Sequence, residues 1–563
     1  LINSTPSDMK LGTSGHERLR LTTEGHMGLN VSNPLSTFEI NSKIGEASLV
    51  NTYISGYQIN PSIASLVNGG YVIVWESAAQ DGSLYGIYGQ LFHADGSKNG
   101  NEFRVNVTTN YQQSFPHVSA NLDKTKGGFM VVWSSEESSG SGTYDIKGQI
   151  YDETKLDGSR TLRDYDITLN TTTTYTQKYP RVAGLTGGDY VVVWESDDGN
   201  TGNMNIYGQI ISYIGNFVGS ETRVNATTTY SQNYPYIAAI SSSDANVPGG
   251  FVVAFMSEYN DNSLYNVKFR VFDSSFTAQS VGDISVTTYG NSGKSNLSSG
   301  LVSVVGLDAG GLVIACYENY EGQASVFGSD TSVTGVTSSA SGNIATRSGS
   351  TLTLSSVSGT FVEDEEISGN LTSKREKISS VSQSGTDATI TLSTDYKKVA
   401  AYKYETNSAS STYSISDVNT TSLVEDAERK AITATNFIRD NTVFTYKRPM
   451  AHISNTNDGN MIITWTNGEI PSIYYQKFYA SNGAVIGSET QVEAVYSELK
   501  QRNQMVCRVK NKERTDGGFC ITWDTESLDL NNTGIRHIKL DEDNFLFRAK
   551  NGFSNTVITH SGN

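Results

Sequence analysis

Two classes of polar loop recur along this chain with residue types that could contact a ligand. Loops of the first class read NYQQSFP, TYTQKYP and TYSQNYP, and each carries a tyrosine and a glutamine two residues apart. A tyrosine ring offers a flat stacking face and a glutamine amide offers a donor and an acceptor, so both suit contact with sugars. A purely structural role in the repeat is the alternative. The candidate ligand-binding residues are Tyr111, Gln113, Tyr175, Gln177, Tyr230 and Gln232.

The second class of loop is rich in Asp, Asn and Gly, as in AAQDGSLYG, ESDDGNTGN and EYNDNSLYN. Carboxylate and amide oxygens of this kind can hold Ca²⁺, but tight turns select the same residues. The candidate residues in these loops are Asp81, Asp197 and Asp261. We expect no metal site and no cofactor, with Ca²⁺ at these loops as the open alternative.

No set of residues matches a known catalytic motif. The sequence contains no nucleophile elbow, phosphate-binding loop, HExxH helix or paired Cys/His spacing. Its seven histidines are scattered and share no repeated position. Acidic residues such as Glu76 and Glu195 follow a recurring tryptophan position, no more than one in each copy, whereas a glycosidase needs two carboxylates at one site. We therefore expect no catalytic residues and no enzymatic activity.

Charge and composition narrow the class of protein further. The 563 residues include 41 Lys and Arg against 58 Asp and Glu, which gives a net charge of −17. Such a chain would repel phosphates, so we expect no nucleic-acid partner. No apolar run is long enough to cross a membrane, so we expect no membrane insertion. The 53 glycines favour an extended β protein with many turns.

A nine-residue phrase, GGYVIVWES at residues 69–77, recurs in seven copies and sets the positions of these loops. Successive copies are spaced by 58, 60, 62, 61, 148 and 59 residues, so one repeat contains an insertion. Self-similarity at a fixed period indicates a repeat architecture. The marker residues, taken at the second glycine of each phrase, are Gly70, Gly128, Gly188, Gly250, Gly311, Gly459 and Gly518.

Each repeat predicts four antiparallel strands. A proline such as Pro116 opens the first strand, and the glycines turn the chain into the second. The second strand, as at residues 71–75, is apolar at every position, which is typical of a strand buried on both faces. We therefore predict an all-β fold, a seven-bladed β-propeller of four-stranded antiparallel blades. A solenoid or a string of separate sandwiches is the alternative.

The domain organisation follows from the interrupted repeat. We predict a connecting segment at residues 1–36, propeller blades at 37–330 and 426–563, and an inserted Ser/Thr-rich small β domain at 331–425, a flexible linker being the alternative. We place the insertion after a third strand near residues 323–330. Residues 37–41 can complete the last blade, or compete for that place with a C-terminal outer strand at residues 544–548. Both non-blade segments would then leave the ring at the end opposite the candidate binding loops.

The connecting segment carries the motif ERLRLTTEGHMGL followed by a proline. This motif resembles a segment of bacteriophage tail-fibre and virion appendage proteins, in which it joins a fibre shaft to a distal domain. The blade phrase also looks like repeats of large secreted bacterial and phage surface proteins. The residues that match the tail-fibre motif are Glu17, Arg18, Arg20, Gly25, Gly28 and Pro34.

The resemblance implies a non-enzymatic structural or attachment protein of a virus particle, located in the virion tail or an appendage. Its implied partners are other virion structural proteins, bound through the N-terminal segment, and a glycan of the host surface. A homo-oligomer, a trimer, would form through the same segment. A secreted bacterial adhesin or cell-surface protein is the alternative, and a polysaccharide-degrading spike is a third hypothesis.

Overall fold

The computed structural model describes residues 9–541 with gaps, the longest of which are 30–37, 153–163, 287–301, 405–431, 440–450, 493–499 and 510–517. Over the described residues the chain is built from β-strands, together with the short 3₁₀ helix η1 (Ala324–Phe327). No helix among those residues has the length and apolar character needed to cross a membrane.

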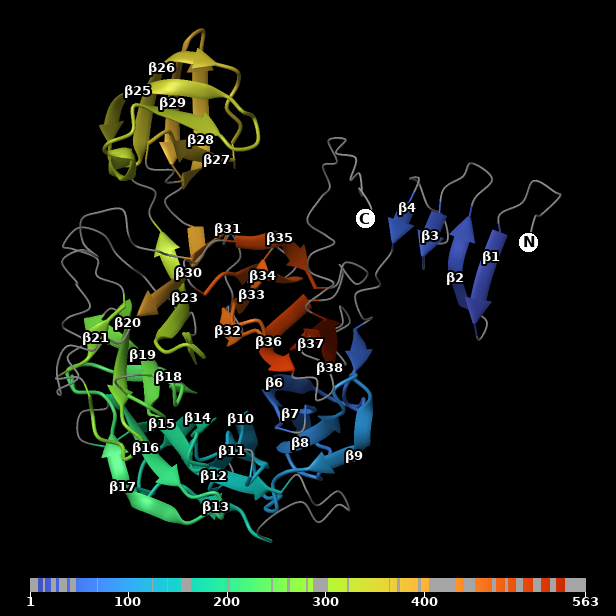
Figure 1. Ribbon diagram of the computed structural model, residues 1–563. Helices are drawn as coiled ribbons and strands as arrows, with labels where there is room; N and C mark the ends of the chain where they lie inside the picture. The colour runs from blue at the N-terminus through green and yellow to red at the C-terminus, as the bar shows by residue number, and fades with distance from the viewer. Residues whose placement is uncertain are drawn as a thin grey trace.

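Four-stranded antiparallel sheets repeat along the chain, and in most of them the strands lie side by side in sequence order (Figure 1). The first sheet contains β6 (Gln58–Ser65), β7 (Tyr71–Ala78), β8 (Tyr85–Phe92) and β9 (Lys98–Arg104). The second contains β10 (Gln113–Ala120), β11 (Phe129–Glu136), β12 (Tyr144–Tyr151) and β13 (Ile167–Thr168). The third contains β14 (Gln177–Gly184), β15 (Tyr190–Asp197), β16 (Met204–Ile211) and β17 (Phe217–Arg223).

Two further sheets follow the same order. One contains β18 (Gln232–Ala239), β19 (Phe251–Asn260), β20 (Leu264–Phe272) and β21 (Ile284–Ser285). The other contains β32 (His452–Asn455), β33 (Met461–Asn467), β34 (Ser472–Phe478) and β35 (Val485–Gln491).

The sheet between these two is split by the insertion. It contains β22 (Ser303–Gly306), β23 (Leu312–Tyr320), β30 (Tyr396–Tyr404) and β31 (Ile432–Arg439). A closed barrel lies between β23 and β30 in sequence, formed by β24 (Ser332–Gly335), β25 (Ser341–Ser348), β26 (Thr351–Ser358), β27 (Glu366–Gly369), β28 (Arg375–Ser384) and β29 (Asp387–Leu392).

This arrangement corrects the predicted position of the insertion. The third strand of the split sheet is β30, not residues 323–330, which contribute η1 to the barrel. Ala324 and Phe327 are buried in the barrel core, so their apolar character serves that domain. Because Tyr320 pairs with Tyr396, the barrel is inserted between the second and third strands of its sheet. The predicted boundary 331–425 therefore includes a strand of the repeat.

The last repeated sheet combines both ends of the chain. It contains β36 (Lys500–Val509), β37 (Gly518–Glu526), β38 (Thr533–Asp541) and β5 (Ser48–Leu49). Beyond β5, the backbone N–H of Val50 donates to the Ile535 carbonyl at 2.8 Å. The predicted C-terminal outer strand at residues 544–548 lies outside the described residues.

A separate N-terminal sheet precedes β5. It contains β1 (Met9–Thr13), β2 (His16–Leu21), β3 (Met27–Leu29) and β4 (Phe38–Ile40). The strand that completes the last sheet thus lies at residues 48–49 instead of the predicted 37–41, because β4 pairs in parallel with β3. The likeness of the N-terminal segment to tail-fibre proteins stays a prediction.

The repeated sheets form a ring. The first strand of each contacts the first strand of the next, in the order β6, β10, β14, β18, β22, β32 and β36, and β36 contacts β6. Figure 1 shows these sheets arranged around a common centre. The fold is therefore all-β and propeller-like, as the repeat predicts.

The repeated phrase forms the walls between neighbouring sheets. β7 and β11 are buried along almost their whole length, and Val72 of β7 shares a hydrophobic cluster with Val118 of β10 and Trp133 of β11. The tryptophan position is structurally equivalent from sheet to sheet, since it pairs with the middle of the third strand each time. This confirms the predicted equivalence of the phrases.

The two ends of the ring carry different connections. We call the front end the one at which the first strands begin, and the opposite one the back end. In an antiparallel sheet the connections between second and third strands lie at the front end, together with the loops that lead to the next sheet. The barrel joins β23 to β30 and so leaves from the front end, whereas the N-terminal segment enters β5 from the back end. The expectation that both leave from one end is wrong.

Candidate functional site

The three predicted glutamine ligands are buried turn residues. Gln113, Gln177 and Gln232 have no exposed surface. The Gln113 amide donates to the Asn110 carbonyl at 2.8 Å, and its Oε1 accepts a hydrogen bond from Trp133 Nε1 at 3.2 Å. The glutamine therefore fastens the loop to the sheet. We correct its assignment as a ligand contact, since no surface is left for a ligand.

The three predicted tyrosines keep more surface at the front end. Tyr111 is 37% exposed and Tyr175 is 42% exposed, while Tyr230 is half-buried. Tyr111 and Tyr230 have left-handed backbone, with φ of 64° and 61°. The ring of Tyr175 lies directly against Gly199, where a Cβ atom would come within 1.9 Å of it. Ligand contact by these tyrosines stays a prediction.

The predicted aspartates close turns. Oδ1 of Asp81 accepts the Ser83 backbone N–H at 3.1 Å, and Oδ1 of Asp197 accepts the Gly199 N–H at 2.8 Å. Asp261 lies outside the described residues. Across the residues that the structure describes, no group of three or more His, Cys, Asp and Glu side chains is placed to hold a metal ion.

A β-bulge interrupts the first strand of several sheets and places one residue in left-handed backbone. Pairing with the second strand shifts register at this point, and the bulged residue has a φ between 50° and 58°. Bulges re-aim side chains at a defined position. The bulged residues are Asn60, Phe115, Tyr179, Tyr234 and Asn503.

Three of these bulged residues are aromatic and pack against one another near the front end. The ring centroids of Phe115 and Tyr179 are 4.5 Å apart, and those of Tyr179 and Tyr234 are 5.4 Å apart. All three side chains are half-buried, so each keeps part of its surface. We call Phe115, Tyr179 and Tyr234 the aromatic arc.

Carboxylates of the preceding sheet hold the arc in place. Oε1 of Glu76 accepts the backbone N–H of Phe115 at 2.7 Å, and Oε1 of Glu195 accepts the N–H of Tyr234 at 2.5 Å. Both carboxylates are buried. Hydrogen bonds of this charge-assisted kind are about twice as strong as neutral ones. The acids that follow the tryptophans thus join one sheet to the next.

A polar network continues the ring of bulges beyond the arc. Asn60 donates its Nδ2 to Glu76 at 2.6 Å and its backbone N–H to Oδ2 of Asp524 at 3.2 Å. Asn503 donates to the same Asp524 oxygen at 2.6 Å and to Oδ1 of Asn60 at 3.0 Å. Two carboxylates from different sheets, Glu76 and Asp524, therefore share the partner Asn60.

Two residues further along the first strands, side chains from sheets that are not neighbours meet. The ring of Tyr236 on β18 lies 5.6 Å from that of His117 on β10 and 5.5 Å from that of His452 on β32. The Arg181 guanidinium carbon on β14 lies 5.6 Å from the Tyr236 ring. Sheets separated by another sheet meet across the ring axis. We call His117, Arg181, Tyr236, Ser303 and His452 the axial cluster.

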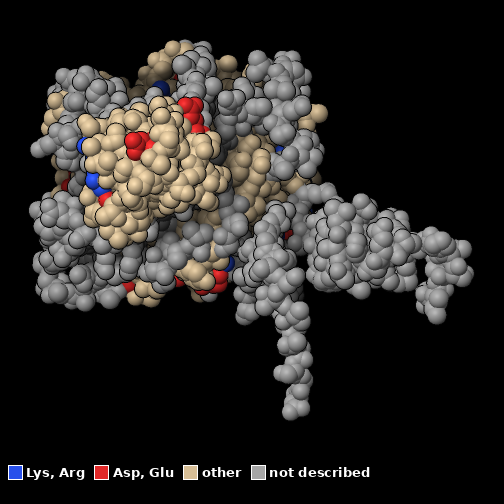
Figure 2. All heavy atoms as spheres, turned by 90° about the horizontal axis from the view of Figure 1, so that it is seen from above, with Lys and Arg blue, Asp and Glu red and all other residues tan. Residues whose placement is uncertain are grey.

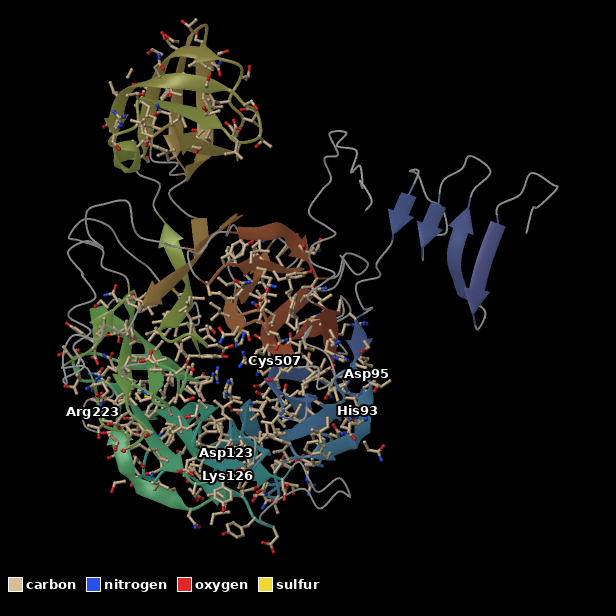
Figure 3. All side chains as sticks on the ribbon, viewed as in Figure 1. His93, Asp95, Asp123, Lys126, Arg223 and Cys507 are labelled. Carbon is tan, nitrogen blue, oxygen red and sulfur yellow. The ribbon has the colours of Figure 1, made fainter. Side chains whose placement is uncertain are left out.

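Figure 3 agrees with an arrangement in which the first strands line the centre of the ring and the fourth strands lie at its rim. Cys507, on the first strand β36, lies beside the centre of the ring, whereas Arg223, on the outer strand β17, lies at its rim. Figure 2 shows that charged side chains of the described residues are few and scattered on the side seen there. The gathering of polar side chains at the ring axis contrasts with this sparsely charged side.

Backbone contacts fix the protonation of the two axial histidines. Nδ1 of His117 accepts the N–H of Val182 at 3.2 Å, and Nδ1 of His452 accepts the N–H of Val506 at 3.2 Å. Burial, and then the Arg181 charge, hold the pKa of His117 well below its usual value and lower that of His452 to about 3. Both rings are therefore neutral at neutral pH, with the proton on Nε2.

The remaining axial groups are also hydrogen-bond donors. His452 donates its Nε2–H to the Tyr236 hydroxyl, and burial raises the pKa of Tyr236 to about 12, so the phenol stays protonated. Ser303 accepts the Ile453 N–H at 3.3 Å. The cluster is thus a set of neutral polar side chains, several of them hydrogen-bonded to one another, around one guanidinium.

The axial histidines correct the expectation that histidines share no repeated position. His117 and His452 occupy the same register, opposite Val132 and Thr464 of their second strands. Turns of different length hide this equivalence when copies are aligned on the glycines. Alignment on the strand-opening prolines places Ser62, His117, Arg181 and Tyr236 at this position, whereas His452 follows Ala451 and has no such proline.

The comparisons with known proteins identify the fold alone. No protein-family model and no curated protein matches the chain. Among solved structures, polysaccharide lyase Uly1 is similar with a TM-score of 0.39 and 8% identity, over 89% of this chain and 91% of that one. A subtype N11 neuraminidase-like protein from A/flat-faced bat/Peru is similar with a TM-score of 0.34 and 9% identity, over 86% and 88% of the two chains. An α-L-arabinanase of Penicillium chrysogenum has a TM-score of 0.34 and 15% identity, over 48% and 82%.

These findings correct the function expected from the sequence. The matched structures include arabinanases, an arabinofuranosidase and a polysaccharide lyase, which are carbohydrate-active enzymes. A non-enzymatic attachment protein of a virus particle, with an adhesin as alternative, is therefore not retained. These matches do not bear out the expectation of no enzymatic activity. At these identities the likeness extends to the fold and assigns no activity to this chain.

Proposed function

We propose that this protein is a seven-bladed β-propeller that binds a carbohydrate chain at its front end, over the aromatic arc. The observation that carries the proposal is the arc itself, three half-buried rings set side by side by bulges. The C–H faces of sugar rings pack on aromatic faces, while sugar hydroxyls need adjacent acceptors and donors. The network of Asn60, Asn503 and Asp524 supplies such groups at the same level of the ring.

The blade number rests on the cyclic contacts of the first strands. Each repeated sheet contacts its two neighbours through that strand, and the last sheet contacts the first. Pairing of β5 with β38 gives the last repeated sheet its fourth strand. A single closed propeller accounts for both features.

Affinity electrophoresis through gels that contain different polysaccharides tests the carbohydrate site. We expect Tyr179→Ala, which removes the central ring of the arc, to weaken binding about 3–10-fold, since one aromatic contact contributes about 0.5–1.5 kcal/mol. The matched control is Tyr213→Ala, because Tyr213 is exposed and follows β16 at the back end. Failure of the protein to bind any polysaccharide, or equal loss in both variants, would contradict the proposal.

A second candidate function is cleavage of the bound chain. Glu76 and Asp524 are carboxylates from different sheets that share Asn60, and glycoside hydrolysis uses two carboxylates on either side of the bond. Release of reducing ends from each polysaccharide that binds would show this activity. Glu76→Gln should then abolish release while binding is retained. Binding without release leaves the protein a carbohydrate-binding module.

A further inference from the structure

We infer that the axial cluster binds an anionic group, so that the carbohydrate recognised at the front end carries a carboxylate or a sulfate. The carbohydrate part of this inference rests on the proposed function. The anion site depends on contacts of its own, which lie one layer deeper along the first strands.

The position of the cluster relative to the arc allows one ligand to reach both. Each arc residue precedes an axial residue by two positions, as Phe115 precedes His117 and Tyr179 precedes Arg181. Two residues along a strand span roughly 6–7 Å, which is similar to the size of a sugar ring with its substituent. A sugar stacked on the arc can therefore direct a ring substituent toward the axis.

The donors of the cluster point to an acceptor-rich ligand. Since Nδ1 of His117 accepts a backbone N–H, its Nε2 carries the proton of the neutral ring. This Nε2–H has no hydrogen-bond partner among the residues that the structure describes. The phenol of Tyr236 adds a hydroxyl to the same axial space, since the two rings are in edge contact.

The charge of the cluster selects an anion over a neutral group. Arg181 is half-buried, and its guanidinium carbon lies 5.6 Å from the Tyr236 ring, which contacts the rings of both His117 and His452. Because the histidines stay neutral, the guanidinium supplies the positive charge of the cluster. This local cation stands out in a protein with a net charge of −17.

The chemistry of the guanidinium fits a carboxylate or sulfate in particular. Nη1 of Arg181 donates to the Pro180 carbonyl at 2.9 Å, which anchors the side chain to its own strand. A guanidinium has five N–H donors in a planar fork, and that fork matches two oxygens of one anionic group. An ammonium would provide the charge without this match.

The test compares acidic and neutral ligands on the whole protein. Binding is measured for polygalacturonate, dextran sulfate and dextran, with wild type, Arg181→Gln and the control Arg270→Gln. Arg270 is a half-buried arginine on β20 that donates to the Val224 carbonyl away from the axis. We expect wild type to bind at least one acidic polymer ten-fold more tightly than dextran, and Arg181→Gln to lose that preference. Arg270→Gln should keep it.

The two acidic polymers separate the two sources of the anion. Selective binding of polygalacturonate identifies a carboxylate, and selective binding of dextran sulfate identifies a sulfate. Arg181→Lys retains the positive charge and serves as a control for folding. If the charge is recognised, this variant should keep a preference for the acidic polymer that is smaller than that of wild type. Equal affinity for acidic polymers and dextran, or an unchanged preference in Arg181→Gln, would overturn the inference while leaving the proposed function intact.

Small ligands test the anion site when no polymer binds. Thermal unfolding is followed with sodium glucuronate, sodium sulfate and glucose at matched ionic strength. Stabilisation by one anion in wild type but not in Arg181→Gln would support the axial site even though the carbohydrate function fails. No anion-dependent shift in either protein would reject the axial site.

Discussion

At the residue scale, one backbone position carries very different chemistry around the ring. The bulge gives five of the repeated sheets a left-handed residue, and in four of these its N–H donates to the preceding sheet. In successive sheets its side chain is an amide, a phenyl ring or a phenol. Because the backbone geometry is held by acceptors such as Glu76, the side chain is left to vary. Substitutions at the bulged residue can therefore change which ligand is recognised with little loss of stability.

Removal of one such acceptor should cost substantial stability. Glu76→Ala leaves the Phe115 N–H and the Asn60 amide without their buried partner, and we expect the free energy of unfolding to fall by about 2–4 kcal/mol. Urea unfolding followed by tryptophan fluorescence measures this. Glu137→Ala is the control, since Glu137 is exposed and its 3.4 Å ion pair with Lys147 should contribute at most about 1 kcal/mol. Similar losses in both variants would refute the role of Glu76.

The buried His452 should make stability depend on pH. Its folded pKa of about 3 lies below the ordinary value of 6.5, so the unfolded chain binds one more proton between these values. Stability should therefore fall as the pH drops below 6.5, by about 1.4 kcal/mol per pH unit. His452→Gln should lose about 2 kcal/mol less than wild type between pH 7 and pH 5. The exposed His93→Gln serves as control, and an unchanged pH dependence in His452→Gln would show that the ring is not buried and neutral.

At the element scale, the strand formed by the repeated phrase can be predicted from the sequence because its burial depends on a few consecutive residues. Continuous apolar runs such as residues 71–75 predict a doubly buried strand, and the structure confirms it. β30 was missed because its sequence, YKKVAAYKY, mixes lysines into a strand and lies beyond an inserted domain. The axial cluster was missed for another reason. Its members contact one another only after the ring closes, so the position that three of them share after the strand-opening prolines does not show that they meet.

The glycine turn between first and second strands can be tested for steric necessity. Gly128 has φ of 87°, and a Cβ there would lie 2.2 Å from the Tyr151 carbonyl oxygen. Gly140 also has positive φ, at 65°, but has open space around it. We expect Gly140→Ala to cost about 1 kcal/mol and Gly128→Ala at least about 2 kcal/mol more. Thermal unfolding of the two variants measures the difference, and equal costs would contradict the close approach.

At the scale of the whole molecule, the inserted barrel has a core of its own. Its apolar side chains, among them Leu352, Ile367 and Ile390, form a separate hydrophobic cluster. The strands on either side of it pair directly, since Tyr320 lies opposite Tyr396. The ring can therefore be built without the barrel.

Two deletions distinguish this boundary from the one expected from sequence. Removal of residues 322–394, with a short turn joining Tyr320 to Tyr396, should leave a ring that still unfolds cooperatively. Removal of residues 331–425 also takes out β30, the third strand of its sheet, and should abolish cooperative unfolding. Calorimetry measures both. The reverse outcome would show that the sheet does not depend on β30.

Closure of the ring through β5 can be tested at the N-terminus. Removal of residues 1–51 takes away β5 and the bond from Ile535 N–H to Oδ1 of Asn51, which measures 2.8 Å. We expect a lower unfolding temperature and association through the exposed edge of β38, seen by light scattering. Removal of residues 1–44 retains β5 and should change neither. Equal behaviour of the two truncations would contradict closure by this strand.

The pairing of β5 with β38 determines when the last sheet can form during synthesis of the chain. Ser48 and His537, partners in the last sheet, are 489 residues apart in the chain. At a translation rate of roughly 5–20 residues per second, β5 leaves the ribosome roughly 25–100 s before β38 is made. The earlier sheets can stack while synthesis continues, but the final one must wait until β38 has been made. Any chaperone that assists this protein should therefore act on an open ring, and the interval before closure is when the nascent chain is most exposed to aggregation.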